Sequence, residues 1–216
     1  MGRLGLIAGS SLGDAEAPAG AWERLNRHQA GAGYVLPHRI DHEANLRRLL
    51  DAGCDRVLAV GSVGGLQPQL GPGTFVSPDD FIALHLGLTA LGGPEAHTVP
   101  GFGGDWRRRV VQAWAQEAEP PLVDGGVYWQ TIGPRLETAA EIRMIARDAD
   151  VLGMTIASEC LLAGELGLAY AAVCIVDNYA NGVGDEPLRI SDLEAGRDAN
   201  LEGLEQALAS VLPALA

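Results

Sequence analysis

The residues of this chain that could do chemistry lie in short glycine-rich or polar segments, and each segment directly follows an apolar run. Serine hydroxyls and the backbone N–H groups of tight turns bind small anions, while carboxylate and amide side chains can hydrogen-bond the polar edge of a ligand. We therefore expect an anion loop at the first segment and ligand contacts at the later ones. The segments are Gly9-Ser10-Ser11-Leu12-Gly13, Gly61-Ser62-Val63-Gly64-Gly65, Gly133-Pro134-Arg135-Leu136-Glu137-Thr138, Gly153-Met154-Thr155 and Asp177-Asn178-Tyr179.

The first two segments each have other interpretations. Gly9–Gly13 matches the G-x-S-x-G elbow of serine hydrolases, with Ser11 as nucleophile, but that motif needs a following helix and residues 14–18 (DAEAP) make a poor one. An anion loop using the Ser10 hydroxyl fits better, and a plain turn stays open. Gly61–Gly65 lacks the G-x-G-x-x-G spacing of a dinucleotide site. The adjacent Gly64 and Gly65 permit a ligand to approach the backbone closely, and an ordinary turn explains them equally well.

Several isolated residues are ambiguous when taken alone. His38 and His42 stand four apart, yet no third ligand accompanies them, so we expect no metal. Glu137 could merely favour a helix dipole, and Asn178 could merely form a turn. Arg27-His28 could be ordinary surface residues. The recurrence of such residues after successive strands is what indicates a site.

Apolar runs and helical patterns alternate along the chain. Strands are expected at 4–8, 56–61, 122–131, 151–153 and 169–176, and helices at 41–53, 138–147 and 159–166. A last helix toward Val211 is expected to begin with the capping box Ser191-Asp192-Leu193-Glu194. This alternation predicts an α/β fold, a single domain over residues 1–216 with a mainly parallel central sheet flanked by helices. In such folds ligands gather beyond the carboxyl ends of the strands.

Composition narrows the class of partner. Hydrophobic residues make up 47% of the chain and charged residues 20%, which is typical of a globular protein, and no apolar run is long enough for a membrane span. The net charge of −13 argues against nucleic acid, whose binding rests on cationic contacts. We expect a cytoplasmic protein. Cys54, Cys160 and Cys174 lack metal-ligand spacing and are expected to be reduced core thiols.

Taken in order, these segments resemble the trimeric purine nucleoside phosphorylase and methylthioadenosine/methylthioinosine phosphorylase family. The strongest stretch is Gly126–Gly182, with GPRLETAAEI, GMTIASE and the strand-final Asn178. A second stretch, Pro37–Ile82, contains HRIDHEAN, SVGGL and DDFI. The resemblance covers roughly three quarters of the chain, and the combination of motifs is specific although each motif alone is not.

The resemblance implies roles for individual residues. Ser10, Arg27, His28, Ser62 through its backbone N–H, and Thr155 through its hydroxyl would bind phosphate. Glu137 and Asn178 would hold the purine, at its Watson–Crick edge and near N7, and are the predicted catalytic pair. The substrate would also contact Gly64, Tyr128 beside ribose and phosphate, Leu136 on the purine, Met154 under the ribose, and His97 from a neighbouring subunit.

The implied reaction is phosphorolysis of a purine nucleoside to free base and ribose 1-phosphate or a 5-substituted analogue. Because an Asp holds the position of Asn178 in adenine-specific relatives, Asn178 with Glu137 favours a 6-oxopurine. The family uses no metal or organic cofactor, has phosphate as co-substrate, and forms homotrimers or dimers of trimers. Two alternatives stay open: a nucleoside-cleaving relative with an altered phosphate site, acting as a hydrolase or on an unusual 5′-substituted substrate, and a non-catalytic purine-binding protein.

The departures from the family pattern fall on the phosphate side. Only 16 residues separate Ser10 from Arg27, where family members usually carry a longer segment with extra strands. Ala32 stands where a second histidine is expected, Gln29 replaces a glycine, and the chain between Leu84 and His97 is trimmed. Purine binding is therefore better supported by the sequence than phosphorolysis.

Overall fold

The computed structural model describes residues 2–10, 12, 22–30, 33–184 and 187–216. Ser11, Gly13, the segment 14–18 and Ala32, on which some of the expectations above rest, lie outside this part of the chain. The strands are β1 Arg3–Ala8, β2 Trp22–Asn26, β3 Gln29–Ala30, β4 Gly33–Tyr34, β5 Cys54–Gly65, β6 Phe75–Ser77, β7 Asp80–Ile82, β8 Leu122–Asp124, β9 Val127–Gln130, β10 Val151–Gly153 and β11 Ala169–Tyr179. The helices are α1 His42–Asp51, α2 Gly104–Glu117, α3 Ala139–Ile145, α4 Ile156–Glu165 and α5 Ile190–Leu215, with 3-10 turns at Pro37–Arg39 and Gly93–Ala96.

Within the described residues, nine strands form one mixed sheet around the long strand β5. The order is β7-β9-β10-β5-β11-β6-β8, and β1 pairs with β5 and with β2. Most pairings are parallel, as expected, but β10 runs antiparallel to β5 and β6 antiparallel to β11. The beginning of β5 pairs with β1, while its last residues, Gly64 and Gly65, pair with β10. Two partners thus share one side of β5, which brings the ends of several strands together.

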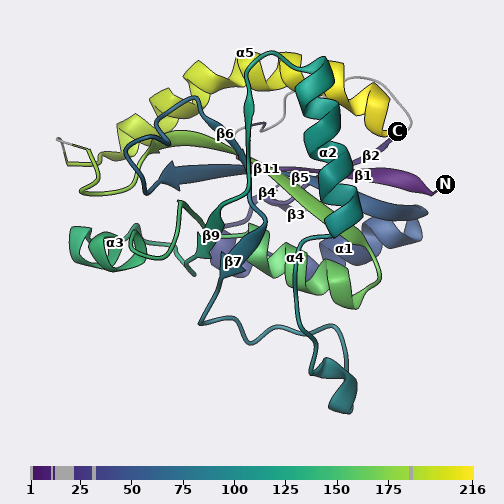
Figure 1. Ribbon diagram of the computed structural model, residues 1–216. Helices are drawn as coiled ribbons and strands as arrows, with labels where there is room; N and C mark the ends of the chain where they lie inside the picture. Colours follow the sequence, from purple (N-terminus) through teal and green to yellow (C-terminus); the bar gives the residue numbers. More distant parts are fainter. Residues whose placement is uncertain (1, 11, 13–21, 31–32, 185–186) are drawn as a thin grey trace.

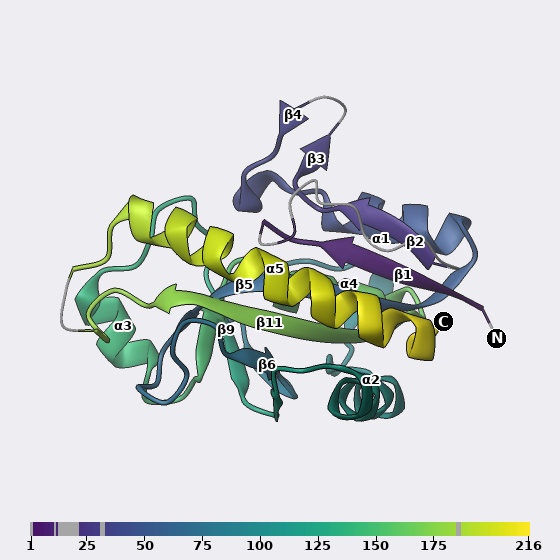
Figure 2. The same ribbon diagram turned by 90° about the horizontal axis from the view of Figure 1, so that it is seen from above.

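Helices cover both faces of the sheet (Figures 1 and 2). Side chains alternate along β1, so that Leu4, Leu6 and Ala8 join a core cluster with α2 and α5, whereas Ile7 faces a second cluster with α1 and α4. The period of two places each apolar residue of a buried strand against one layer or the other. Burying both faces accounts for the continuous apolar runs of β5 and β11.

Most predicted elements are present, but the short strands β2, β3, β4, β6 and β7 were not predicted, and three other differences follow. The strand expected at 122–131 is two strands, because Gly125 and Gly126 adopt φ values of +104° and +110° that an L-residue rarely adopts. Helix α2 was not anticipated. Helix α5 begins earlier than the predicted capping box, since the Asp192 carboxylate accepts from the Arg189 backbone N–H at 2.8 Å and Ser191 lies inside the first turn.

Helices α1 and α3 begin with side-chain caps. The Asp41 side chain accepts from the Ala44 N–H, and Thr138 with Glu141 forms a capping box before α3. Cys54, Cys160 and Cys174 are buried free thiols. Among the described helices, none has the length and apolar character needed to cross a membrane.

Candidate active site

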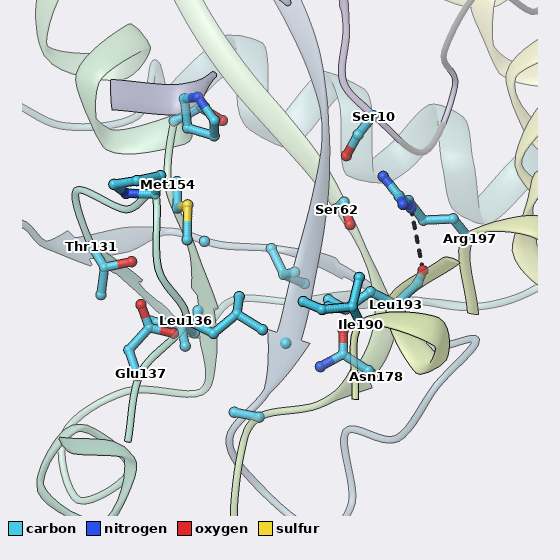
Figure 3. Close-up of a pocket in the computed structure, with 18 of the residues that line it drawn as sticks. Ser10, Ser62, Thr131, Leu136, Glu137, Met154, Asn178, Ile190, Leu193 and Arg197 are labelled. Carbon is cyan, nitrogen blue, oxygen red and sulfur yellow. Dashed lines mark hydrogen bonds between the residues drawn. The ribbon is translucent and has the colours of Figure 1, made fainter. Parts of the chain in front are cut away.

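A cavity of about 560 Å³ lies beyond the ends of the central strands. Its walls come from the turn after β1, the ends of β5, β10 and β11, the loop before α3, and the first turns of α5 (Figure 3). Ten of the residues predicted from the sequence line it: Ser10, Arg27, His28, Ser62, Gly64, Leu136, Glu137, Met154, Thr155 and Asn178. Residues from positions 10 to 178 thus meet in one place.

Arg27 enters the cavity wall from a buried ion pair. Its Nε and Nη2 donate to the two carboxylate oxygens of Glu159 at 2.6 and 3.0 Å, and its Nη1 donates to the Val60 carbonyl at 2.6 Å. Both side chains are almost completely buried, at 1% and 2% exposure. Burial alone would raise the pKa of Glu159, but the Arg27 charge together with the hydrogen bonds from His42 and Arg27 lowers that pKa to about 2. Glu159 therefore balances the charge of Arg27 and fixes its orientation.

His28 is held as a neutral ring. Its Nδ1 lies 3.0 Å from the Val35 carbonyl oxygen, and the ring stacks on Tyr34 with centroids 5.1 Å apart. Burial lowers the pKa of His28 below its ordinary value. A carbonyl oxygen can only accept, so Nδ1 carries the proton in the neutral ring and Nε2 is an acceptor. Such an Nε2 can accept a hydrogen bond from a protonated phosphate oxygen.

Ser62 lies near the end of β5, and Thr155 precedes α4. The Ser62 hydroxyl donates to the Asp177 carboxylate in a very short contact, and its backbone pairs with Ile175 of β11. Thr155 is the residue before α4, and its hydroxyl makes no capping hydrogen bond within the described chain. Both side chains line the same cavity as Ser10.

The opposite part of the cavity combines apolar and polar contacts. Leu136 and Met154 supply apolar surface, and Glu137 and Asn178 are only 9% and 8% exposed. The Asn178 amide donates to the Tyr179 carbonyl at 2.7 Å, and the Asn181 amide donates to the Glu137 carbonyl at 3.0 Å. A flat heterocycle with hydrogen-bonding edges is the kind of ligand that such a wall accommodates.

Comparisons with known proteins place the chain in a family. A family model described as the Phosphorylase superfamily matches residues 27–213. The chain belongs to the phosphorylase superfamily. It is 43% identical over 152 residues to a probable 6-oxopurine nucleoside phosphorylase of Archaeoglobus fulgidus, covering 70% of this chain and 63% of that protein. It is 38% identical over 193 residues to a probable S-methyl-5'-thioinosine phosphorylase of Xanthomonas campestris, covering 84% of this chain and 76% of that protein.

A solved phosphorylase structure has the same fold. The methylthioadenosine phosphorylase of Schistosoma mansoni in complex with adenine superimposes with a TM-score of 0.82 at 22% identity, covering 99% of this chain and 90% of that one. The α/β fold and the family expected from the sequence are thus confirmed. The chain spans 63% of the length of the Archaeoglobus relative, less than two thirds.

Two of the residues predicted to contact the substrate lie outside the cavity wall. Tyr128 was expected beside ribose and phosphate, but it is 1% exposed and its hydroxyl accepts from the N–H groups of Thr155 and Ile156 at 3.2 and 3.3 Å. These hydrogen bonds stabilise the start of α4. The Tyr128 ring fits there because Gly153 has no side chain. His97 is exposed and directly follows the 3-10 turn Gly93–Ala96. The segment between β7 and α2 that contains this turn extends away from the sheet (Figure 1), and the expected contact of His97 with a neighbouring subunit stays a prediction.

The structure also adds residues that the sequence did not single out. The largest group comes from the start of α5 and the turn before it: Leu188, Ile190, Leu193, Glu194 and Arg197. Their spacing of three and four residues indicates that they share one face of a helix. The same spacing is expected of a helix face that packs against the core, so it does not identify a site. Thr131 also lines the cavity, and its buried hydroxyl has no hydrogen-bond partner among the described residues.

Proposed function

We propose that this protein cleaves the N-glycosidic bond of a purine nucleoside by phosphorolysis, with a preference for 6-oxopurines. The products are the free base and ribose 1-phosphate or its 5-substituted analogue. One observation carries the proposal: a single cavity joins an apolar wall with Glu137 and Asn178 to a polar wall of serine, threonine, arginine and histidine side chains. The proposed reaction needs a purine and a phosphate held together in this way.

In this reaction, a phosphate oxygen forms a bond to C1′ of the sugar while the bond from C1′ to the purine nitrogen breaks. The electron pair of that bond passes to the purine, and the sugar passes through an oxocarbenium-like state. Catalysis requires groups that stabilise the charge developing on the base more strongly in the transition state than in the substrate. Asn178 does so near N7 and O6, and Glu137 holds the Watson–Crick edge.

The side chain at position 178 supports the preference for 6-oxopurines. An amide can accept from a protonated N7 through its oxygen and donate to O6 through its nitrogen. A carboxylate can only accept, which would favour the 6-amino group of adenine. The relatives named above as 6-oxopurine nucleoside and S-methyl-5'-thioinosine phosphorylases act, by their names, on bases of this type.

The wall formed by α5 suggests what the 5′ end of the substrate carries. With the purine at Glu137 and the phosphate at Ser10, the 5′ carbon is left to face Leu188, Ile190 and Leu193. These side chains favour an apolar 5′ substituent, such as a methylthio group, over a hydroxyl, which they could not hydrogen-bond. We propose a 5′-substituted 6-oxopurine nucleoside as the preferred substrate and the plain nucleoside as a weaker one.

We further propose that the enzyme works in the cytoplasm as a homotrimer, or a dimer of trimers, without metal or organic cofactor. In the described residues, no three His, Cys, Asp or Glu side chains gather as a metal site would require. The projecting segment around His97 would complete the site of the next subunit. Light scattering tests the assembly. A mixture of inactive Asn178→Ala and His97→Ala proteins should regain activity, since mixed trimers contain sites with neither defect, whereas a fully active monomer would contradict the trimer.

The proposed reaction is tested by measuring base release from inosine, guanosine, adenosine and their 5′-methylthio analogues, each with and without phosphate. We expect release of hypoxanthine or guanine that depends on phosphate, fastest with the 5′-methylthio compound. Release that is independent of phosphate would identify a hydrolase instead. Calorimetric binding of purine without turnover would identify a purine-binding protein.

A further inference from the structure

Arg197 is the cation that α5 brings to the phosphate side of the cavity. It is half-buried, lines the cavity together with Ser10 and Ser62, and its guanidinium group extends from the helix toward Ser10 (Figure 3). Its Nε donates to the Leu193 carbonyl at 3.2 Å, one turn earlier on the same helix. The Nη1 and Nη2 groups make no hydrogen bond or ion pair within the described residues, which leaves them available to a ligand.

The two arginines of the cavity differ in charge balance. The charge of Arg27 is cancelled by the two-point contact with Glu159, so Arg27 can offer its remaining N–H groups but adds no net positive charge. Arg197 has no carboxylate within 4 Å among the described residues. Glu194 lies on the same helix and also lines the cavity, but it is exposed and its charge is screened by water. Arg197 therefore carries the uncompensated positive charge of this wall.

Phosphate needs such a charge here. The other groups predicted to bind it are neutral, namely the hydroxyls of Ser10 and Thr155, the neutral His28 ring and the backbone at Ser62. An anion removed from water is stabilised by a cation that hydrogen-bonds it directly. A chain of net charge −13 also repels phosphate at longer range. We infer that Arg197 binds the phosphate co-substrate, an inference that rests on the proposed phosphorolysis.

The helix that carries Arg197 is fixed to the phosphate wall. The Asn200 amide donates to the Asp177 carboxylate at 2.8 Å and to the Val176 carbonyl at 3.1 Å. Asp177 is the same residue that accepts from the Ser62 hydroxyl. Next to Arg197, Gly196 has no side chain, and a Cβ there would overlap the Asp177 carbonyl oxygen. The close approach of α5 to β11 therefore sets the position of Arg197 relative to Ser62.

The test compares Arg197→Gln and Arg197→Lys with Arg189→Gln as a matched control. Arg189 is an exposed arginine at the start of the same helix and lies outside the cavity wall. Binding of inorganic phosphate is measured by calorimetry without nucleoside, and the phosphate KM is measured in the base-release assay. We expect Arg197→Gln to weaken phosphate binding and raise the phosphate KM by about tenfold to a hundredfold. Arg197→Lys should recover part of the loss, and Arg189→Gln should match the wild type.

Other outcomes overturn the inference in distinguishable ways. If the wild type binds phosphate and Arg197→Gln binds it equally well, Arg197 is not a phosphate ligand and phosphorolysis still stands. A wild type that binds no phosphate and releases base without it would remove the proposed phosphorolysis and this inference together. Inosine 5′-monophosphate serves as a second probe. If its binding falls in Arg197→Gln while phosphate binding does not, Arg197 faces the 5′ end of the nucleoside instead.

Discussion

The buried pair of Arg27 and Glu159 makes a stability prediction whose size follows from the structure. Glu159→Gln keeps the shape of the side chain but removes the charge that balances Arg27. The pKa of Glu159 lies at about 2 instead of its ordinary 4.5, a difference of about 2.5 units, and at about 1.36 kcal/mol per unit this corresponds to about 3 kcal/mol. That value matches the roughly 3–5 kcal/mol typically lost when one partner of a buried ion pair is removed. For a domain of this size the melting temperature should fall by about 6–12 °C.

The pH dependence of this loss is the sharper test. A carboxyl whose folded pKa is lowered contributes stability that is fully present above its unfolded pKa and is lost as the pH falls toward the folded value. The gap between wild type and Glu159→Gln should therefore be widest near pH 7 and narrow from about pH 5 downward. Urea unfolding followed by tryptophan fluorescence measures it.

Glu141→Gln is the matched control for this experiment. Its hydrogen bonds from Arg135 also lower the pKa of Glu141 to about 2, but that ion pair is exposed to solvent. The substitution should therefore change the free energy of unfolding far less. Equal stability of Glu159→Gln and wild type at pH 7, or a gap that does not change between pH 7 and pH 3.5, would refute the reasoning.

Three further substitutions test the site. Asn178→Asp should lower inosine turnover and improve relative adenosine use. The shift in transition-state discrimination between the two substrates should be on the order of 2–4 kcal/mol. Unchanged selectivity in kcat/KM would show that Asn178 does not contact the base. Tyr128→Phe leaves two buried N–H groups at the start of α4 without their acceptor. It should therefore lower the free energy of unfolding in urea by about 1–3 kcal/mol and raise the phosphate KM. No change in either measurement would contradict the supporting role of Tyr128. Gly196→Ala should lower the free energy of unfolding by about 1–3 kcal/mol, because the new methyl group meets the Asp177 carbonyl. A variant with wild-type stability and kinetics would show that α5 can shift without consequence.

The sequence predicted the strand-end part of the cavity because local composition marks it. Glycine, serine and asparagine after a buried run have few roles other than turns and ligand contacts, and their order along the chain matched a family pattern. The Arg27–Glu159 contact was not predicted, since its partners are 132 residues apart and only the fold brings them together. Tyr128 was predicted to line the site from the resemblance alone. In the structure its ring is buried against Gly153, behind the residues that line the cavity.

The contribution of α5 could not be predicted for a related reason. Ile190, Leu193 and Arg197 follow the ordinary spacing of a helix face, and nothing local says whether that face meets the core or a cavity. Whether the face meets the core or a cavity depends on the position of α5 along β11. The close approach at Gly196 and the hydrogen bonds of Asn200 set this position. The capping residues were also misplaced, because Ser191 and Glu194 fit the sequence motif, whereas the structure uses the Asp192 carboxylate on the Arg189 backbone N–H, a contact that the motif does not describe.

The two halves of helix α5 have different contacts, the first with the cavity and the second with the core. The residues after Asn200 that are buried, Leu204, Ala207, Leu208, Val211, Leu212 and Leu215, belong to the core, while the cavity meets only the first two turns. Residues 188–194 can therefore vary while Gly196, Arg197 and the apolar packing that maintains the fold are kept. Gene duplicates of such an enzyme could diverge in the 5′ group they accept through a handful of changes in one short segment. The same segment is the natural place to graft a new 5′ preference onto this scaffold.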